Sequence, residues 1–181
     1  MRTVTFADPD LIEWMNGAFV LLWSDARPID EQVAEPGEIQ PVYTPEELAA
    51  YPDGGGGRNL RTVFVRPDGS YLHGLHGWWP AALFREECDR ALRLLAIPEP
   101  GDAEARQLAD LDGLDAEAAR LRRDQPAEFR KPVGQSPVAR RAAALELLAR
   151  EARTLREETR GSTLETMLES FREENSGREF K

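Results

Sequence analysis

The stretch from residue 59 to residue 77 constrains the fold more than any other part of this chain. It reads NLRTVFVRPDGSYLHGLHG, with two runs of strand-forming residues separated by Pro67-Asp68-Gly69. β-Branched and aromatic residues favour strands, and the Pro-Asp-Gly triplet favours a tight turn. The sequence therefore predicts a β-hairpin over 59–77.

The segments on either side of the hairpin predict further elements. Asp8-Pro9 is typical of a helix start, and apolar residues at helical spacing follow it as far as Gly17. The continuous apolar run 19–23 predicts a strand buried on both faces. A capping box and a first-turn proline predict a short helix over 45–51. After the hairpin, an amphipathic pattern predicts a helix over 80–96 that lies on a sheet.

The second half of the chain has the composition of helices. Alanine, leucine, arginine and glutamate dominate from residue 101 onward. The expected helices cover 102–111, 115–123, 137–159 and 163–174. Apolar stripes on the last two predict packing within the chain or between copies of it. We therefore expect a domain over 1–98 and a helical, partly flexible extension over 99–181.

The order of elements in the first half resembles the later part of a thioredoxin-like domain. The phrase that carries this resemblance runs from Phe6-Ala7-Asp8 through Met15-Asn16 and Phe19-Val20 to Asp25. The Pro-Asp-Gly turn, a strand ending at Gly77 and a final amphipathic helix are also similar to that family. The resemblance implies an α/β fold, a thioredoxin-like three-layer sandwich with an α-helical C-terminal extension.

Two chemical landmarks of the thioredoxin-like family do not match this sequence. The redox cysteines of that family precede the first matching helix, so the first strand and the CxxC turn are expected to be missing. Arg61 stands near the position where the family has a cis-proline. Disulfide exchange requires a reactive thiolate and a resolving thiol. The resemblance therefore implies a redox-inactive member.

Charge and cysteine content exclude several classes of partner. The formal net charge is −10, which disfavours binding to a phosphate backbone. No apolar run approaches the ~18 residues of a membrane span, and no secretory signal pattern begins the chain. With Cys88 as its one cysteine, the chain forms no intrachain disulfide, which suits a reducing compartment. We predict a cytoplasmic protein with no nucleic-acid partner, no membrane partner and no cofactor.

Three residues are weak candidates for chemistry. Cys88 shares a helical face with apolar residues, which predicts a core position, and it would be a catalytic thiol only if it were exposed beside a positive charge. His73 and His76 form an HxxH pattern, which invites a metal site. Residues three apart on a strand point to opposite faces, so a shared metal is disfavoured. We expect one histidine to be partly buried and the other to lie at the sheet rim.

The tryptophans are the candidates for binding. Trp78 and Trp79 are adjacent at a strand-to-helix junction, where both cannot easily enter one core. Exposed tryptophans frequently anchor protein interfaces. We expect at least one of the pair to be packed, and the other, with Trp23, to contribute to a partner surface.

These observations lead to three hypotheses of function. The first is a redox-inactive protein-interaction or assembly module, which self-associates or binds a partner through helices 137–159 and 163–174. The second is a thiol–disulfide or peroxidase-like enzyme that uses Cys88 alone. The third is a metal-binding module through His73 and His76. The absent redox landmarks favour the first hypothesis and disfavour enzymatic activity.

Overall fold

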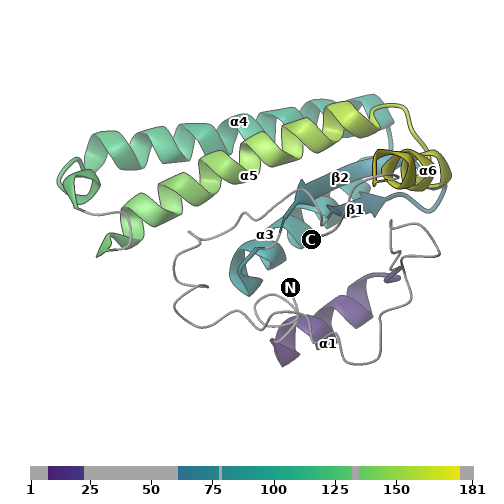
Figure 1. Ribbon diagram of the computed structural model, residues 1–181, viewed down its shortest axis with the longest axis horizontal. Coiled ribbons are helices and arrows are strands. Elements are labelled where there is room, and N and C mark those ends of the chain that lie inside the picture. Colours follow the sequence, from purple (N-terminus) through teal and green to yellow (C-terminus); the bar gives the residue numbers. More distant parts are fainter. Residues whose placement is uncertain (1–7, 23–60, 78, 132–134, 176–181) are drawn as a thin grey trace.

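The computed structural model describes residues 8–22, 61–77, 79–131 and 135–175. In this part of the chain a β-hairpin lies beside a long antiparallel pair of helices (Figure 1). The elements in chain order are α1 Pro9–Ala18, β1 Arg61–Val65, β2 Tyr71–His76, α3 Ala81–Leu95, α4 Pro100–Asp124, the 3-10 turn η2 Glu128–Arg130, α5 Pro137–Thr159 and α6 Leu164–Asn175.

The predicted hairpin over 59–77 is confirmed in its described part. Strands β1 and β2 pair antiparallel, with Phe64 opposite His73 and a β-bulge between Phe64 and Val65. Gly69 occupies the turn at a φ of 81°, a conformation that glycine adopts without strain. The Asp68 carboxylate accepts a hydrogen bond of 2.9 Å from the Ser70 backbone N–H. The turn chemistry read from the sequence therefore sets the register.

Most helix predictions are also confirmed. Helix α5 has the predicted bounds, and the Ser136 hydroxyl accepts a hydrogen bond of 3.1 Å from the Ala139 backbone N–H at its start. Asp8 caps α1 in the same way, with backbone donors at positions 10 and 11. Helices α3 and α6 lie within a residue of their predicted bounds.

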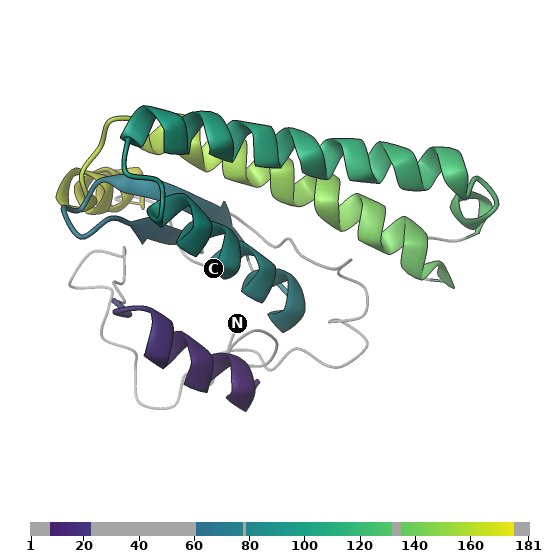
Figure 2. The same cartoon turned by 180° about the vertical axis from the view of Figure 1, so that it is seen from behind.

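The two helices predicted over 102–111 and 115–123 are one continuous helix, α4. Gly113 lies near its middle, and a single internal glycine costs only about 1 kcal/mol relative to alanine. Leu111, Leu114 and Ala118 are buried on one side of α4. Helix α4 lies alongside α5 (Figures 1 and 2), and these three residues share a buried cluster with residues of α5, which offsets the weak helix propensity at the glycine.

The expected thioredoxin-like sandwich is wrong. Within the described residues the sheet has only two strands, and helices make up most of the structure. Residues 19–22 are not the predicted buried strand, because they form no strand and Val20 is 91 % exposed. A doubly buried strand needs neighbouring strands on a sheet, and in the described part of the chain β1 and β2 pair only with each other. The predicted helix 45–51 and Trp23 lie outside the described residues.

Helices cover both faces of the hairpin. Gly74 of β2 faces α5, where an added Cβ atom would lie 2.5 Å from Leu155 Cδ2. On the other face, Phe64 of β1 packs against Phe19, with ring centroids 5.6 Å apart. Gly74 is therefore what lets α5 lie directly on the strand.

One hydrophobic core joins the two halves of the chain. Leu75 and Phe84, from the predicted domain 1–98, belong to the same buried cluster as Leu111, Leu145 and Leu148 from the predicted extension 99–181. A second, smaller cluster joins Leu155 to Met167 and Phe171 of α6. The apolar stripes of α5 and α6 are thus used for packing within the chain. Among the described helices, none is both long enough and apolar enough to cross a bilayer.

Candidate functional site

Cys88 lies in the core of the protein. Its side chain, on α3, is fully buried, as its place on the apolar helical face predicts. Burial, together with the nearby carboxylates of Asp89 and Glu87, raises the pKa of the Cys88 thiol to about 12. A neutral, enclosed thiol is neither a nucleophile nor a metal ligand. The environment of Cys88 therefore does not favour the thiol-enzyme hypothesis.

His73 is buried between β2 and two helices. Its Nε2 atom lies 2.8 Å from Glu87 Oε2, and its Nδ1 atom lies 3.0 Å from Gln107 Nε2. Because the Gln107 amide nitrogen can only donate, the network assigns the acceptor role to Nδ1 and the donor role to Nε2. The ring also stacks on Phe64, with centroids 5.8 Å apart. Both nitrogens of His73 are thus engaged by protein groups.

The His73 contact is part of a longer buried polar network. Glu87 accepts hydrogen bonds of 3.1 and 3.2 Å from Arg90, and Arg90 also pairs with Asp110 at 3.3 Å. Burial alone would raise the pKa of Glu87, but the hydrogen bond from His73 and the charge of Arg90 hold it below its ordinary value. The network joins β2, α3 and α4 in the interior of the protein, so its role is to hold these three elements together.

His76 faces the opposite side of β2 from His73, as alternation along a strand predicts. It is 2 % exposed, so both histidines are buried and the prediction of a rim position is wrong. Its ring nitrogens lie 3.4 Å from Glu151 Oε2 and 3.2 Å from Glu158 Oε2, but neither contact has hydrogen-bond geometry. Burial lowers the pKa of His76 despite these carboxylates, and Arg61 contributes to the lowering.

The structure does not bring His73 and His76 together as metal ligands. They point to opposite faces of β2, toward Glu87 and toward Glu151 and Glu158 respectively. Among the residues that the structure describes, no group of three or more histidine, cysteine, aspartate or glutamate side chains has an arrangement that suits a metal ion. The geometry therefore does not favour the metal hypothesis.

Trp79 is a core residue. It is fully buried, and its indole N–H donates a hydrogen bond of 2.9 Å to the His76 carbonyl oxygen. This bond satisfies the polar end of the ring inside the core. The other two binding candidates, Trp78 and Trp23, lie outside the described residues. Trp79 is thus the packed member that was expected of this pair, and it contributes to the core and not to a partner surface.

An exposed apolar segment follows α1. Phe19 is partly buried against Trp14 and Phe64, with ring centroids 5.8 and 5.6 Å away. The next three residues are largely exposed: Val20 by 91 %, Leu21 by 50 % and Leu22 by 78 %. Sequence reasoning found this apolar run but assigned it to the interior of a sheet.

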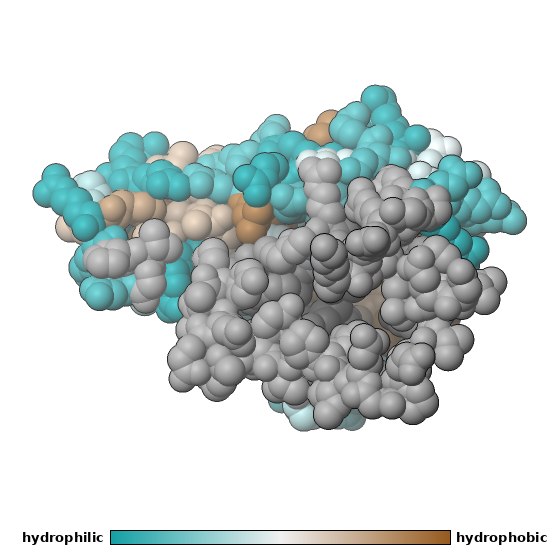
Figure 3. Space-filling model, viewed as in Figure 1, coloured by the Kyte–Doolittle hydropathy of each residue, from teal (hydrophilic) through white to brown (hydrophobic). Residues whose placement is uncertain are grey.

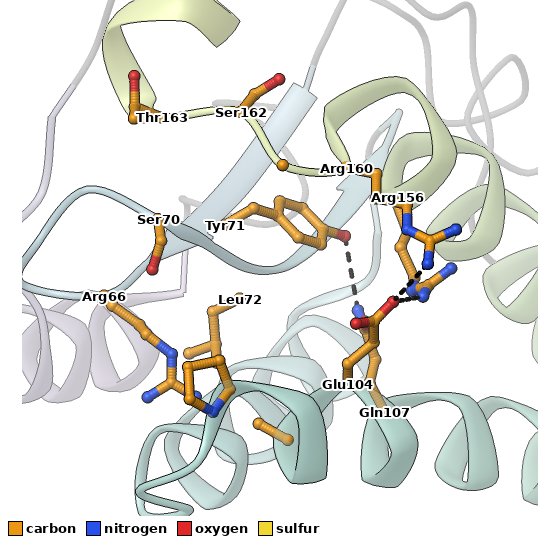
Figure 4. Close-up of a pocket in the computed structure, with 13 residues that line it drawn as sticks. Arg66, Ser70, Tyr71, Leu72, Glu104, Gln107, Arg156, Arg160, Ser162 and Thr163 are labelled. Atoms are coloured by element: carbon orange, nitrogen blue, oxygen red, sulfur yellow. Dashed lines mark hydrogen bonds and ion pairs between the residues drawn. The ribbon is translucent and has the colours of Figure 1, made fainter.

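A pocket of about 230 Å³ lies between the hairpin turn, the first turn of α4 and the corner that joins α5 to α6 (Figure 4). Its charged lining consists of Arg66, Arg156, Arg160 and Glu104. The phenol of Tyr71 also lines it, and burial raises the pKa of this phenol, so it stays protonated. No spacing in the sequence indicates this pocket, because its arginines come from a turn and from a distant helix end.

No protein-family model matches this chain, and no curated protein or solved structure matches it either. The function is therefore inferred from three structural features. These are the buried histidines and cysteine, the exposed apolar segment after α1, and the arginine-lined pocket.

Proposed function

We propose that this protein acts by binding another protein chain, without redox chemistry, and that the segment Phe19–Leu22 forms the contact. The observation that carries the proposal is the consecutive exposure of Val20, Leu21 and Leu22. Exposed apolar side chains are common singly, but adjoining ones typically mark a surface that a partner covers.

The anchoring of this segment supports the proposal. Phe19 packs on Phe64 of β1, so the three exposed side chains start from a fixed point on the core. A contact segment held at one end loses less conformational entropy on binding than a free chain end does. On the face seen in Figure 3, the upper edge of α4 and α5 is hydrophilic, while tan and brown residues form a band along part of its lower side. The apolar stripes of α5 and α6, first considered for self-association, are already covered within the chain.

Site-specific photocrosslinking tests the contact. A benzophenone amino acid at position 20 should form crosslinks in cells that produce the full chain, either to a partner protein or to a second copy. The matched control carries the same probe at Asn16, an exposed position one turn earlier on α1. Adding Leu22→Asp to the position-20 variant should abolish its crosslinks. Identical products from positions 16 and 20 would contradict the proposal.

The absence of redox chemistry is tested separately at Cys88. Because this thiol is fully buried, it should react with iodoacetamide only when urea unfolds the protein. The measurement is the alkylated fraction by mass spectrometry as a function of urea concentration. Rapid alkylation of the folded protein at neutral pH would instead favour a single-cysteine enzyme.

A further inference from the structure

The proposed contact segment belongs to the most acidic part of the chain. Residues 1–60 contain eleven acidic and three basic residues, so they carry a net charge of −8 within the chain's total of −10. Residues 61–181 carry the remaining −2 and are nearly balanced. Charge concentrated in one part of a chain selects the sign of the surfaces that approach it.

The same sign holds next to the contact segment. Residues 8–22 include Asp8, Asp10 and Glu13 and no basic residue. The Asp8 carboxylate caps α1, whereas Asp10 and Glu13 are exposed. An α-helix rises 1.5 Å per residue, which places these two carboxylates within about 15 Å of Phe19 along the helix. Exposed negative charge therefore accompanies the exposed apolar side chains.

A positive charge on the neighbouring helix is offset by its own partner. The Arg85 guanidinium of α3 stacks on the Trp14 ring, 3.3 Å from its centroid. Its Nε atom also lies 3.3 Å from the Asp89 carboxylate. Arg85 therefore leaves the acidic character of α1 in place.

The sign of this charge selects among the possible occupants. Nucleic acids and anionic membrane surfaces are negative, so they are repelled. In a two-fold symmetric contact between copies, the same segment faces itself, and acidic side chains would meet acidic ones. The arginine-lined pocket in Figure 4 does not supply a positive surface on a second copy, because Arg156 and Arg160 both pair with Glu104. A basic protein surface is the complementary occupant.

We propose that the partner of Phe19–Leu22 is a different protein, with an apolar groove that binds Val20–Leu22 and lysine or arginine side chains that face Asp10 and Glu13. This inference rests on the proposed function and adds the chemistry of the partner. An apolar centre with a polar rim is the usual anatomy of a protein interface. Charges at such a rim mainly accelerate association and make it sensitive to salt.

Photocrosslinking at position 20 tests the partner's chemistry when it is repeated in lysate at about 50 and about 500 mM sodium chloride. We expect a product with a different protein, and a yield at least about threefold lower at high salt, because salt screens exposed charges. Mass spectrometry of the crosslinked peptide should find lysine or arginine close in sequence to its apolar residues. The purified position-20 variant, irradiated alone, should form no crosslinked dimer.

Charge variants identify the residues that face the partner. Asp10→Asn combined with Glu13→Gln should lower the crosslink yield about threefold or more at low salt and remove most of its dependence on salt. The matched control is Glu165→Gln combined with Glu169→Gln, which removes two exposed carboxylates from α6 and should crosslink like the parent protein. All four side chains are exposed, so the circular dichroism spectrum should stay unchanged.

The outcomes separate this inference from the proposed function. A crosslinked dimer of this chain, or a yield that depends neither on salt nor on Asp10 and Glu13, would overturn the basic partner and leave the contact at Phe19–Leu22 in place. Failure of position 20 to crosslink to any protein would contradict the proposed function, and this inference with it.

Discussion

At the scale of single residues, the informative side chains are the buried polar ones. Glu87 and His73 satisfy each other inside the core, whereas His76 is buried close to two carboxylates without hydrogen-bond geometry. Burying a charged or polar group is costly unless its partners are well placed. These two sites should therefore respond differently to substitution and to pH.

Glu87→Gln should lower the free energy of unfolding by about 3 kcal/mol, because it leaves the buried Arg90 with one carboxylate partner fewer. Urea denaturation followed by circular dichroism measures the change. The control is Glu86→Gln, the adjacent glutamate, whose pair with Arg141 is exposed and is expected to contribute less than about 1 kcal/mol. Equal effects at positions 86 and 87 would show that the buried network does not stabilise the fold.

His76 should make stability depend on pH. Its pKa is lowered in the folded protein, so below the ordinary value of 6.5 the unfolded chain binds a proton more readily than the folded one. The free energy of unfolding therefore has its full value above pH 6.5 and falls as the pH drops below 6.5. His76→Gln should reduce this slope between pH 7 and pH 5, measured by urea denaturation at each pH. An unchanged slope in the variant would refute this role.

At the scale of elements, two glycines that look alike in sequence have opposite roles. At Gly74 an added Cβ atom would lie 2.5 Å from Leu155 Cδ2 and 2.8 Å from the Thr62 carbonyl oxygen. At Gly113, inside α4, it would meet nothing within 4 Å. The first glycine is required by the packing of α5 on β2, and the second is a local weakness in a helix.

Gly74→Ala should destabilise the protein by about 1–3 kcal/mol, because α5 and β2 must move apart. Gly113→Ala should stabilise it by about 1 kcal/mol, because alanine has the higher helix propensity. Melting temperatures by circular dichroism should shift in opposite directions. If Gly113→Ala destabilises the protein, α4 is interrupted near that residue, as the sequence pattern predicts.

At the scale of the whole molecule, the core connects segments that the sequence divides into a domain and an extension. All four tryptophans precede residue 99, while Leu148 lies in α5 and is 1 % exposed within the common cluster. A shared core implies that both segments unfold in one cooperative transition.

Leu148→Ala should lower the free energy of unfolding by about 2–5 kcal/mol, because it leaves a cavity in this core. The transition seen by tryptophan fluorescence should shift to lower urea concentration together with the one seen by circular dichroism. An unshifted fluorescence transition would mean that 1–98 and 99–181 are independent domains.

The sequence alone determined much of the local structure of this protein. The Pro-Asp-Gly turn predicted the hairpin, Ser136 and Asp8 predicted helix starts, and amphipathic spacing predicted α3, α5 and the core position of Cys88. These signals depend on neighbours along the chain, so they can be read without a fold.

Only the tertiary structure decided how those elements combine. The two-stranded sheet, the continuity of α4, the exposure of Val20–Leu22 and the pocket between the hairpin turn and the end of α5 all depend on how segments far apart in sequence pack. An apolar run has the same pattern whether a sheet buries it or it extends into solvent, and separate arginines give no periodic signal. The exposure of Val20–Leu22, where a partner contact is proposed, could therefore not be predicted before the chain was folded.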